Sequence, residues 1–290
     1  MNETLVKTTG KLIVSDKSDQ LSSLNKSEIF DLLDTHGYIL FRGFDTSLKT
    51  FSEFVQKMSS KITLDPARKF HEKNAQRVDA GIEEVGLHIE NGNGPIIPDL
   101  CWFYCKEAPE RGSQTTVCDG KAVFENMPYE LKQIFRKETI TYSRNVSKDI
   151  WRAYIAHELG GQVAPEHITI DHLRVIQEKL PNLETIINED GSLHYSFTVS
   201  PLLMKGNETY FANSILGPSF NYEKPTIKFS NGIEVNEYLV NDLKKLTDEF
   251  TENIEWKDGD MVLINNQRVM HGRRKITAKK REIYNALSFR

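Results

Sequence analysis

Short apolar runs, each about the length of one β-strand, are the feature that most constrains the fold of this chain. The clearest are YILF at 38–41, LCWFYC at 100–105, TTVC at 115–118 and MVLIN at 261–265. Such runs, when turn residues bound them, are typical of strands buried in a sheet. Helical spacing occurs between them, as in Ser27–Thr35, where Ser27 is the expected N-cap and Gly37 the expected end. The pattern predicts an α+β chain whose core is a β-sandwich or barrel.

The organisation along the chain indicates one domain. No internal repeat and no Pro-, Gly- or Ser-rich linker divides the 290 residues. We therefore expect a single domain over residues 1–290. Mixed helical spacing over roughly 145–190 predicts a helical insert in this domain, and its clearest helical piece is 172–180.

Charge and hydropathy argue against several classes of function. Lys and Arg number 37 and Asp and Glu number 41, a net charge of −4, and no basic stripe is present, so we expect no nucleic-acid partner. No apolar run approaches the roughly 18 residues of a membrane span, so we expect no membrane partner. The polar start lacks a signal-peptide core, and three cysteines favour reduced thiols, so the sequence predicts a cytoplasmic protein.

The tripeptide His88-Ile89-Glu90 is the first candidate for chemistry. In an extended segment, residues i and i+2 point to the same side. An imidazole and a carboxylate would then project together, as two neighbouring ligands of a metal ion do. Taken alone, the pair also fits a hydrogen-bonded histidine beside a surface glutamate.

His271 is a candidate third ligand from a distant strand, because it follows the MVLIN run and a short turn. Two histidines and one carboxylate on one side of a metal leave three positions open. That arrangement suits non-haem Fe(II), which binds a co-substrate and then O2. The same donors also suit Zn²⁺ in a hydrolase, so the residues alone leave both classes open.

Five stretches in a fixed order carry a resemblance to a known family. They are GYILFRGF at 37–44, LHIE at 87–90, PDLCWFYC at 98–105, GSQTTVCDG at 112–120 and the block around His271. In this order they resemble the taurine-dioxygenase-like, clavaminate-synthase-like superfamily of Fe(II)/2-oxoglutarate-dependent oxygenases. The resemblance implies an α+β fold with a double-stranded β-helix core, which is a distorted jelly roll, with surrounding helices and a helical lid insert.

The resemblance also implies roles for single residues. His88, Glu90 and His271 match the catalytic ligands of Fe(II). Thr115 and Arg281 match the residues that hold the two carboxylates of the co-substrate 2-oxoglutarate. Family halogenases carry a small residue in place of Glu90, so its carboxylate implies a hydroxylase rather than a halogenase.

Further polar residues are candidate contacts of the primary substrate. Two follow the metal pair closely, one lies at the insert, one lies in a strand pattern and one follows Arg281. They are Asn91, Asn93, Arg144, Asn213 and Asn285. Asn285 stands where several relatives have a second, substrate-binding arginine, which argues against an anionic substrate group at that point. Ser113 is another departure, since a glycine is common there.

The resemblance implies an enzyme that consumes O2 and 2-oxoglutarate, releases succinate and hydroxylates an unactivated C–H bond. The Glu90 branch and the TTVCDG stretch favour an amino acid or a peptide-like intermediate of natural-product biosynthesis as the small-molecule substrate, free or bound to a carrier protein. The alternative within the class is a taurine-type oxygenase of sulfonates or small organic acids.

Two alternatives of other classes are a Zn-dependent hydrolase and a non-catalytic, barrel-shaped binding protein. The hydrolase gives no role to Arg281 or Thr115. The binding protein gives no reason for three metal ligands.

Overall fold

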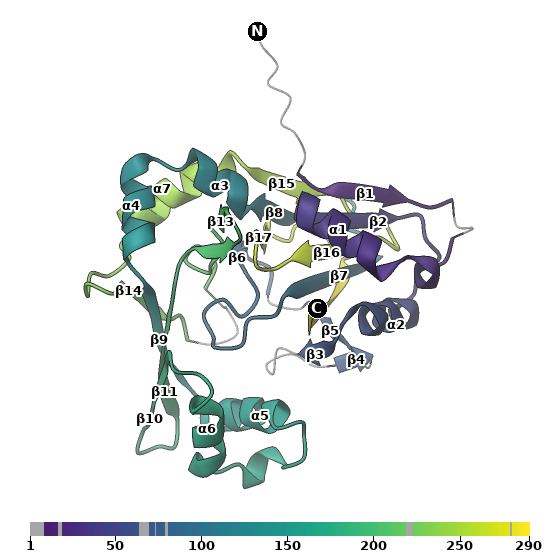
Figure 1. Cartoon of the computed structure of the whole chain (residues 1–290). Helices are drawn as coiled ribbons and strands as arrows, with labels where there is room; N and C mark the ends of the chain where they lie inside the picture. Colours follow the sequence, from purple (N-terminus) through teal and green to yellow (C-terminus); the bar gives the residue numbers. More distant parts are fainter. Residues whose placement is uncertain are drawn as a thin grey trace.

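Two β-sheets of unequal size form the main body of the molecule (Figure 1). The structure is a computed structural model that describes residues 9–16, 19–63, 70–72, 74–78, 81–218, 223–278 and 280–290. In spatial order the larger sheet holds β1 (Lys11–Val14), β2 (Tyr38–Arg42), β16 (Met261–Asn265), β7 (Leu100–Glu107), β18 (Glu282–Phe289), β5 (Ala75–Arg77) and β4 (Phe70–Glu72), with β3 (Lys61–Thr63) also paired to β18. The smaller sheet holds β15 (Thr251–Ile254), β8 (Thr115–Asp119), β17 (Val269–Arg273) and β6 (Val85–His88).

Strand β7 is buried on both faces and separates two cores. On one face lie Phe51 and Phe54 of helix α2 (Leu48–Met58). The Phe51 ring stacks on that of Tyr104 with their centroids 5.5 Å apart, and the Phe54 ring meets that of Trp102 edge to face with their centroids 5.8 Å apart. On the other face, Phe103 packs in a core that includes residues of both sheets. Because successive side chains of a strand alternate, the aromatic run LCWFYC supplies both cores.

Helix α1 (Lys26–His36) is capped differently from the prediction. Its N-cap is Asn25, whose side-chain oxygen accepts from the backbone N–H groups of Ser27 and Glu28. Ser27 therefore lies in the first turn. Asparagine is as good an N-cap residue as serine, and Asn25, two residues earlier, satisfies the free N–H groups. Gly37 ends the helix as expected. Its φ of +77° is one that residues with a Cβ rarely adopt.

The insert is not purely helical, which corrects the expectation for residues 145–190. It holds α5 (Lys148–Glu158), a 3-10 turn at Pro165–His167 and α6 (Ile170–Gln177), but it ends in strand β10 (Leu183–Ile187). Buried Leu183 alternates there with exposed Glu184, the period of a strand rather than of a helix. A third sheet, at the lower left of Figure 1, orders β10 with β11 (Leu193–Val199), β9 (Ile140–Val146) and β14 (Thr226–Phe229).

Helices α3 (Gly120–Asn126), α4 (Tyr129–Lys137) and α7 (Glu237–Asp248) lie beside the smaller sheet in Figure 1, as does β13 (Glu208–Tyr210). Strand β12 (Leu203–Lys205) pairs with β13, and a 3-10 turn at Leu21–Ser23 precedes α1. Among the described residues, none of the helices combines the length and the apolar composition that crossing a bilayer requires. The three cysteines, Cys101, Cys105 and Cys118, are buried and form no disulfide bond. Burial raises the pKa of Cys105 and Cys118 to about 12.

Candidate metal centre and active-site cavity

Three side chains with metal-ligand chemistry converge where β6 and β17 pair. His271 of β17 lies directly opposite His88, the last residue of β6, and Glu90 follows two residues later. One donor atom from each of the three residues lies within 4.8 Å of the others. The His271 Nε2 and Glu90 Oε1 atoms are 3.4 Å apart, and the two imidazole centroids are 4.5 Å apart. This donor set can hold a divalent metal ion.

Backbone contacts orient these ligands. His88 Nδ1 lies 2.8 Å from the carbonyl oxygen of Gly86. When Nδ1 carries the proton and donates it there, Nε2 keeps its lone pair for a metal. Asn266 accepts from the Glu90 N–H at 2.8 Å and donates to the carbonyl oxygens of Glu90 and Pro98, so it fixes the segment that carries the carboxylate.

Close backbone packing beside His88 requires glycine at two positions. A Cβ on Gly86 would lie 2.1 Å from the carbonyl oxygen of Leu216, and a Cβ on Gly217 would lie 2.1 Å from that of Gly86 and 3.1 Å from His88 Nδ1. Two glycines therefore let the loop around residues 213–217 cover the first ligand of the candidate metal centre.

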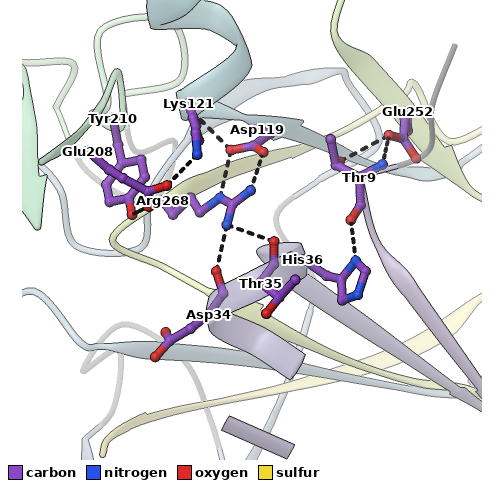
Figure 2. Close-up of polar contacts among 10 residues, drawn as sticks. All are labelled: Thr9, Asp34, Thr35, His36, Asp119, Lys121, Glu208, Tyr210, Glu252 and Arg268. Carbon is purple, nitrogen blue, oxygen red and sulfur yellow. Dashed lines mark hydrogen bonds and ion pairs between the residues drawn. The ribbon is translucent and has the colours of Figure 1, made fainter. Parts of the chain in front are cut away.

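Arg268 fixes the start of β17, three residues before His271 (Figure 2). Its Nε and Nη2 donate to the Asp119 carboxylate at 3.0 and 2.7 Å. Its Nη1 donates to the carbonyl oxygens of Asp34 and Thr35 at 2.7 and 3.2 Å. These carbonyls belong to the C-terminal turn of α1, where the helix dipole favours a cation. One buried guanidinium thus joins β17, the end of β8 and α1.

A cavity continues from the candidate metal centre toward Arg281, which precedes β18. Arg281 Nε donates to the carbonyl oxygen of Ser113 at 3.2 Å. Burial, together with the nearby charge of Arg273, lowers the pKa of Arg281 to about 10, and no Asp or Glu of the described residues forms an ion pair with it. Arg281 is charged at neutral pH, so this end of the cavity suits an anionic ligand.

Two residues with no assigned role in the sequence support this end of the cavity. Trp256 Nε1 donates to Thr115 Oγ1 at 3.1 Å, which leaves the Thr115 hydroxyl hydrogen free to donate into the cavity. Ser113 adopts a φ of +59°, and its Oγ accepts from the backbone N–H groups of Thr277 and Ala278. A hydroxyl in place of the common glycine thus ties the 112–120 stretch to the segment leading to Arg281.

The opposite end of the cavity lies under the insert, and three predicted substrate contacts line it: Asn91, Asn93 and Arg144. Asn91 has a φ of +56° and donates through Nδ2 to the carbonyl oxygen of Ile96. Arg144 Nε donates to the hydroxyl of Tyr195 at 2.7 Å, and that hydroxyl donates to the carbonyl oxygen of Asn93 at 3.1 Å. Tyr195 lies in β11, and no local sequence motif predicted that it would bind Arg144.

The two other predicted substrate contacts are not among the residues that line the cavity. Asn213 is buried in a loop, donates to the carbonyl oxygen of Pro201 and accepts from the N–H of Ile215, so its amide serves the backbone. Asn285 is fully buried in β18, beside Phe103 of β7. Neither amide therefore belongs to the described cavity wall, and that of Asn285 has no hydrogen-bond partner among the described residues.

The site and the fold together define a class of protein. Two histidines and a carboxylate at a cavity with a cationic far end form the kind of site that non-haem Fe(II) enzymes use with an anionic co-substrate. Residues 7–287 match the Taurine catabolism dioxygenase TauD, TfdA family, so the chain belongs to this family.

Individual relatives agree with this assignment. The chain is 23% identical over 269 residues to the dapdiamide synthesis protein DdaC of Enterobacter agglomerans, covering 85% of this chain and 80% of that one. It is 21% identical to the clavaminate synthase-like protein At3g21360 of Arabidopsis thaliana, covering 88% and 82%. Among solved structures, it matches PvcB with a TM-score of 0.60 at 13% identity, covering 97% and 85%. PvcB is described as an Fe, alpha-ketoglutarate dependent oxygenase from an isonitrile synthetic pathway.

These matches confirm the resemblance inferred from the sequence. The chain is an Fe(II)/2-oxoglutarate-dependent dioxygenase. Its fold of mixed sheets and helices is the one that these oxygenases share.

Proposed function

We propose that this protein hydroxylates an unactivated C–H bond of an amino-acid-derived or peptide-like small molecule, with 2-oxoglutarate converted to succinate. The observation that carries the proposal is one cavity with three parts: a His-His-Glu centre, a cationic end at Arg281 and a second end under the insert. The first two parts fit the metal and the co-substrate. The third fits a separate organic substrate. The relatives named for dapdiamide synthesis and for an isonitrile pathway support a role in natural-product chemistry.

In this proposal, His88 and His271 hold Fe(II) through Nε2, and Glu90 holds it through its carboxylate. When bound, Fe(II) with 2-oxoglutarate and O2 supplies the oxidant. Arg281 binds the distal carboxylate of 2-oxoglutarate through parallel N–H bonds, and the Thr115 hydroxyl donates to the co-substrate. The protein's own contribution is to hold the reactants in position and to exclude water.

We also infer that the two facing sheets form the double-stranded β-helix that the resemblance implies, in one domain over residues 1–290. The core shared by both sheets supports this inference, as does a structural match that covers 97% of the chain.

Two observations weigh against the alternatives. Neither a hydrolase nor a binding protein explains why Arg281, at the far end of the cavity, has no Asp or Glu partner among the described residues. A taurine-type substrate is small and polar, whereas most of the residues around the insert end are apolar.

The metal-centre variants test the proposal. Under anaerobic conditions, Fe(II) and 2-oxoglutarate should give a weak visible charge-transfer band, and in air they should yield succinate. His88→Ala, Glu90→Ala and His271→Ala should each abolish the band or reduce succinate release to background, because a ligand is lost. His167→Ala, at an exposed histidine of the insert, is the matched control and should behave as wild type. Full activity in all three ligand variants, or turnover with Zn²⁺ and no 2-oxoglutarate, would refute the proposal.

A further inference from the structure

The insert end of the cavity has apolar walls built from five elements. Its wall residues come from β9, α5, α6, β10 and β11: Val146, Ile150, Trp151, Tyr154, Ile155, Leu173, Ile176, Leu183 and Leu193. We call this region the apolar compartment. Apolar walls of this kind stabilise a ligand through the apolar surface that it buries.

One cation stands at the boundary between this compartment and the metal centre. Arg144 and Tyr195 are direct partners in the β9–β11 pairing, and both side chains are buried and line the cavity. The Arg144 guanidinium also lies over the Tyr195 ring, at 5.4 Å from its centroid. The Tyr195 hydroxyl reaches the backbone of Asn93, three residues after Glu90. The guanidinium is therefore anchored beside the metal-binding segment.

Tyr195 orients this cation. Burial raises the pKa of Tyr195, so its hydroxyl keeps its proton at neutral pH. It donates that proton to the Asn93 carbonyl and accepts from Arg144 Nε. A planar guanidinium held in this way matches the two oxygens of a carboxylate.

The charges around the cavity are unequal. Among the described residues that line it, Arg144, Arg273 and Arg281 are cationic, and Glu90 is the only acid. Glu90 belongs to the candidate metal centre. The described wall therefore offers a cationic partner for a substrate carboxylate. Outside the candidate metal centre it offers no anionic partner for a substrate ammonium group, whose burial without a counter-charge is costly.

We propose that the primary substrate is a carboxylic acid with a free carboxylate bound by Arg144, a large apolar body in the apolar compartment and no charged amine. An N-acylated apolar amino acid has this chemistry. A substrate joined to a carrier protein through the same carboxyl does not, because a thioester has no charge for Arg144 to bind. This inference rests on the proposed function and narrows its substrate class.

Four probes test the three requirements: one reference compound, and three others that each differ from it in one required feature. N-acetyl-L-phenylalanine meets all of them. N-acetyl-L-phenylalaninamide lacks the charge, N-acetylglycine lacks the apolar body, and L-phenylalanine has a charged amine. Each is titrated calorimetrically into the full-length protein loaded with Zn²⁺ and 2-oxoglutarate. We expect N-acetyl-L-phenylalanine to bind about ten- to a hundredfold more tightly than the amide or N-acetylglycine, and more tightly than L-phenylalanine.

Variants locate the carboxylate. Arg144→Gln should weaken N-acetyl-L-phenylalanine by about ten- to a hundredfold and leave the amide unchanged. Tyr195→Phe keeps the ring and should lower the affinity for N-acetyl-L-phenylalanine about two- to tenfold. This second variant tests the proposal if Arg144→Gln does not fold. Arg174→Gln, at an exposed arginine of α6, is the matched control and should have no effect.

Binding of 2-oxoglutarate to the same Zn²⁺-loaded samples separates the two proposals. If 2-oxoglutarate does not bind, the proposed function fails. If 2-oxoglutarate binds but L-phenylalanine or the amide binds as tightly as the acid, only the substrate inference is overturned. The same holds if Arg144→Gln weakens the acid and the amide equally.

Discussion

Two arginines of this protein, Arg268 and Arg281, lie in regions with opposite electrostatics. Arg268 is buried with the Asp119 carboxylate and with two carbonyls at the end of α1 (Figure 2). Burial lowers its pKa, but the hydrogen bond and the charge of Asp119 oppose burial, and the pKa is raised. Arg281 donates to the backbone carbonyl of Ser113, and burial together with the nearby charge of Arg273 lowers its pKa.

The difference shows how a scaffold charge and a binding charge can be told apart. A scaffold charge has its counter-charge within the chain, so its removal leaves the partner buried and unpaired. A binding charge is neutralised only by its ligand, so its removal affects the ligand and not the fold. The region around Arg268 therefore holds β17 in place, whereas the surroundings of Arg281 fit a binding charge, as proposed above.

The largest effect is expected at the scaffold arginine. Arg268→Ala should lower the free energy of unfolding by about 3–5 kcal/mol, because the Asp119 carboxylate stays buried without its partner. Urea denaturation measures this loss. The double variant Arg268→Met/Asp119→Leu should recover much of it, since it buries no uncompensated charge. A loss below about 1 kcal/mol in Arg268→Ala would contradict the scaffold role.

A smaller effect, and of another kind, is expected at the binding arginine. Arg281→Gln should raise the KM for 2-oxoglutarate about ten- to a hundredfold, since a charge-assisted hydrogen bond contributes roughly 1.5–3 kcal/mol. Its free energy of unfolding should stay the same or rise, because a desolvated cation is removed. Steady-state kinetics and urea denaturation on one preparation give both values.

Lys280 is the matched control for this prediction. Its side chain is 74% exposed and lies 3.5 Å from the carboxylate of Glu107. Lys280→Gln should therefore leave the KM for 2-oxoglutarate unchanged. A defect in this variant with none in Arg281→Gln would show that the wrong cation was assigned to the co-substrate.

The smallest effect is expected at Trp256, which supports Thr115, a proposed contact of the co-substrate. Trp256→Phe removes the N–H that fixes the Thr115 hydroxyl. A neutral hydrogen bond contributes about 0.5–1.5 kcal/mol, so the KM for 2-oxoglutarate should rise about two- to tenfold. Affinity for the primary substrate should not change, because Trp256 does not line the cavity. An equal loss for both ligands would point to general disruption instead.

The sequence predicted those parts of the site that depend on local geometry. His88 and Glu90 share one side because they are two residues apart in an extended segment, and His271 reaches them as the pairing of β6 and β17 requires. Arg281, which the resemblance assigned to the co-substrate, lines the same cavity as these three residues. The family resemblance, confirmed by the match over residues 7–287, supplied the order of these elements.

The parts that the sequence did not predict depend on contacts between distant segments. Asn266 meets Glu90 across 176 positions, Trp256 meets Thr115 across 141, and Tyr195 meets Arg144 across 51. No spacing rule relates such pairs, because the tertiary fold alone brings them together. The strand at the end of the insert was missed for a related reason. Its apolar residues, Leu183, Ile186 and Ile187, are spaced i, i+3 and i+4 as in a helix, and only the pairing with β11 shows that the segment is a strand.

The three buried cysteines have a practical consequence. Because Cys101, Cys105 and Cys118 are inaccessible, and two of them have raised pKa values, thiol-directed dyes should leave the folded wild-type chain unlabelled. A cysteine introduced at Val175, which is 45% exposed on α6, would then be the one reactive thiol. A fluorophore placed there would report directly how the insert responds when an acid enters the apolar compartment.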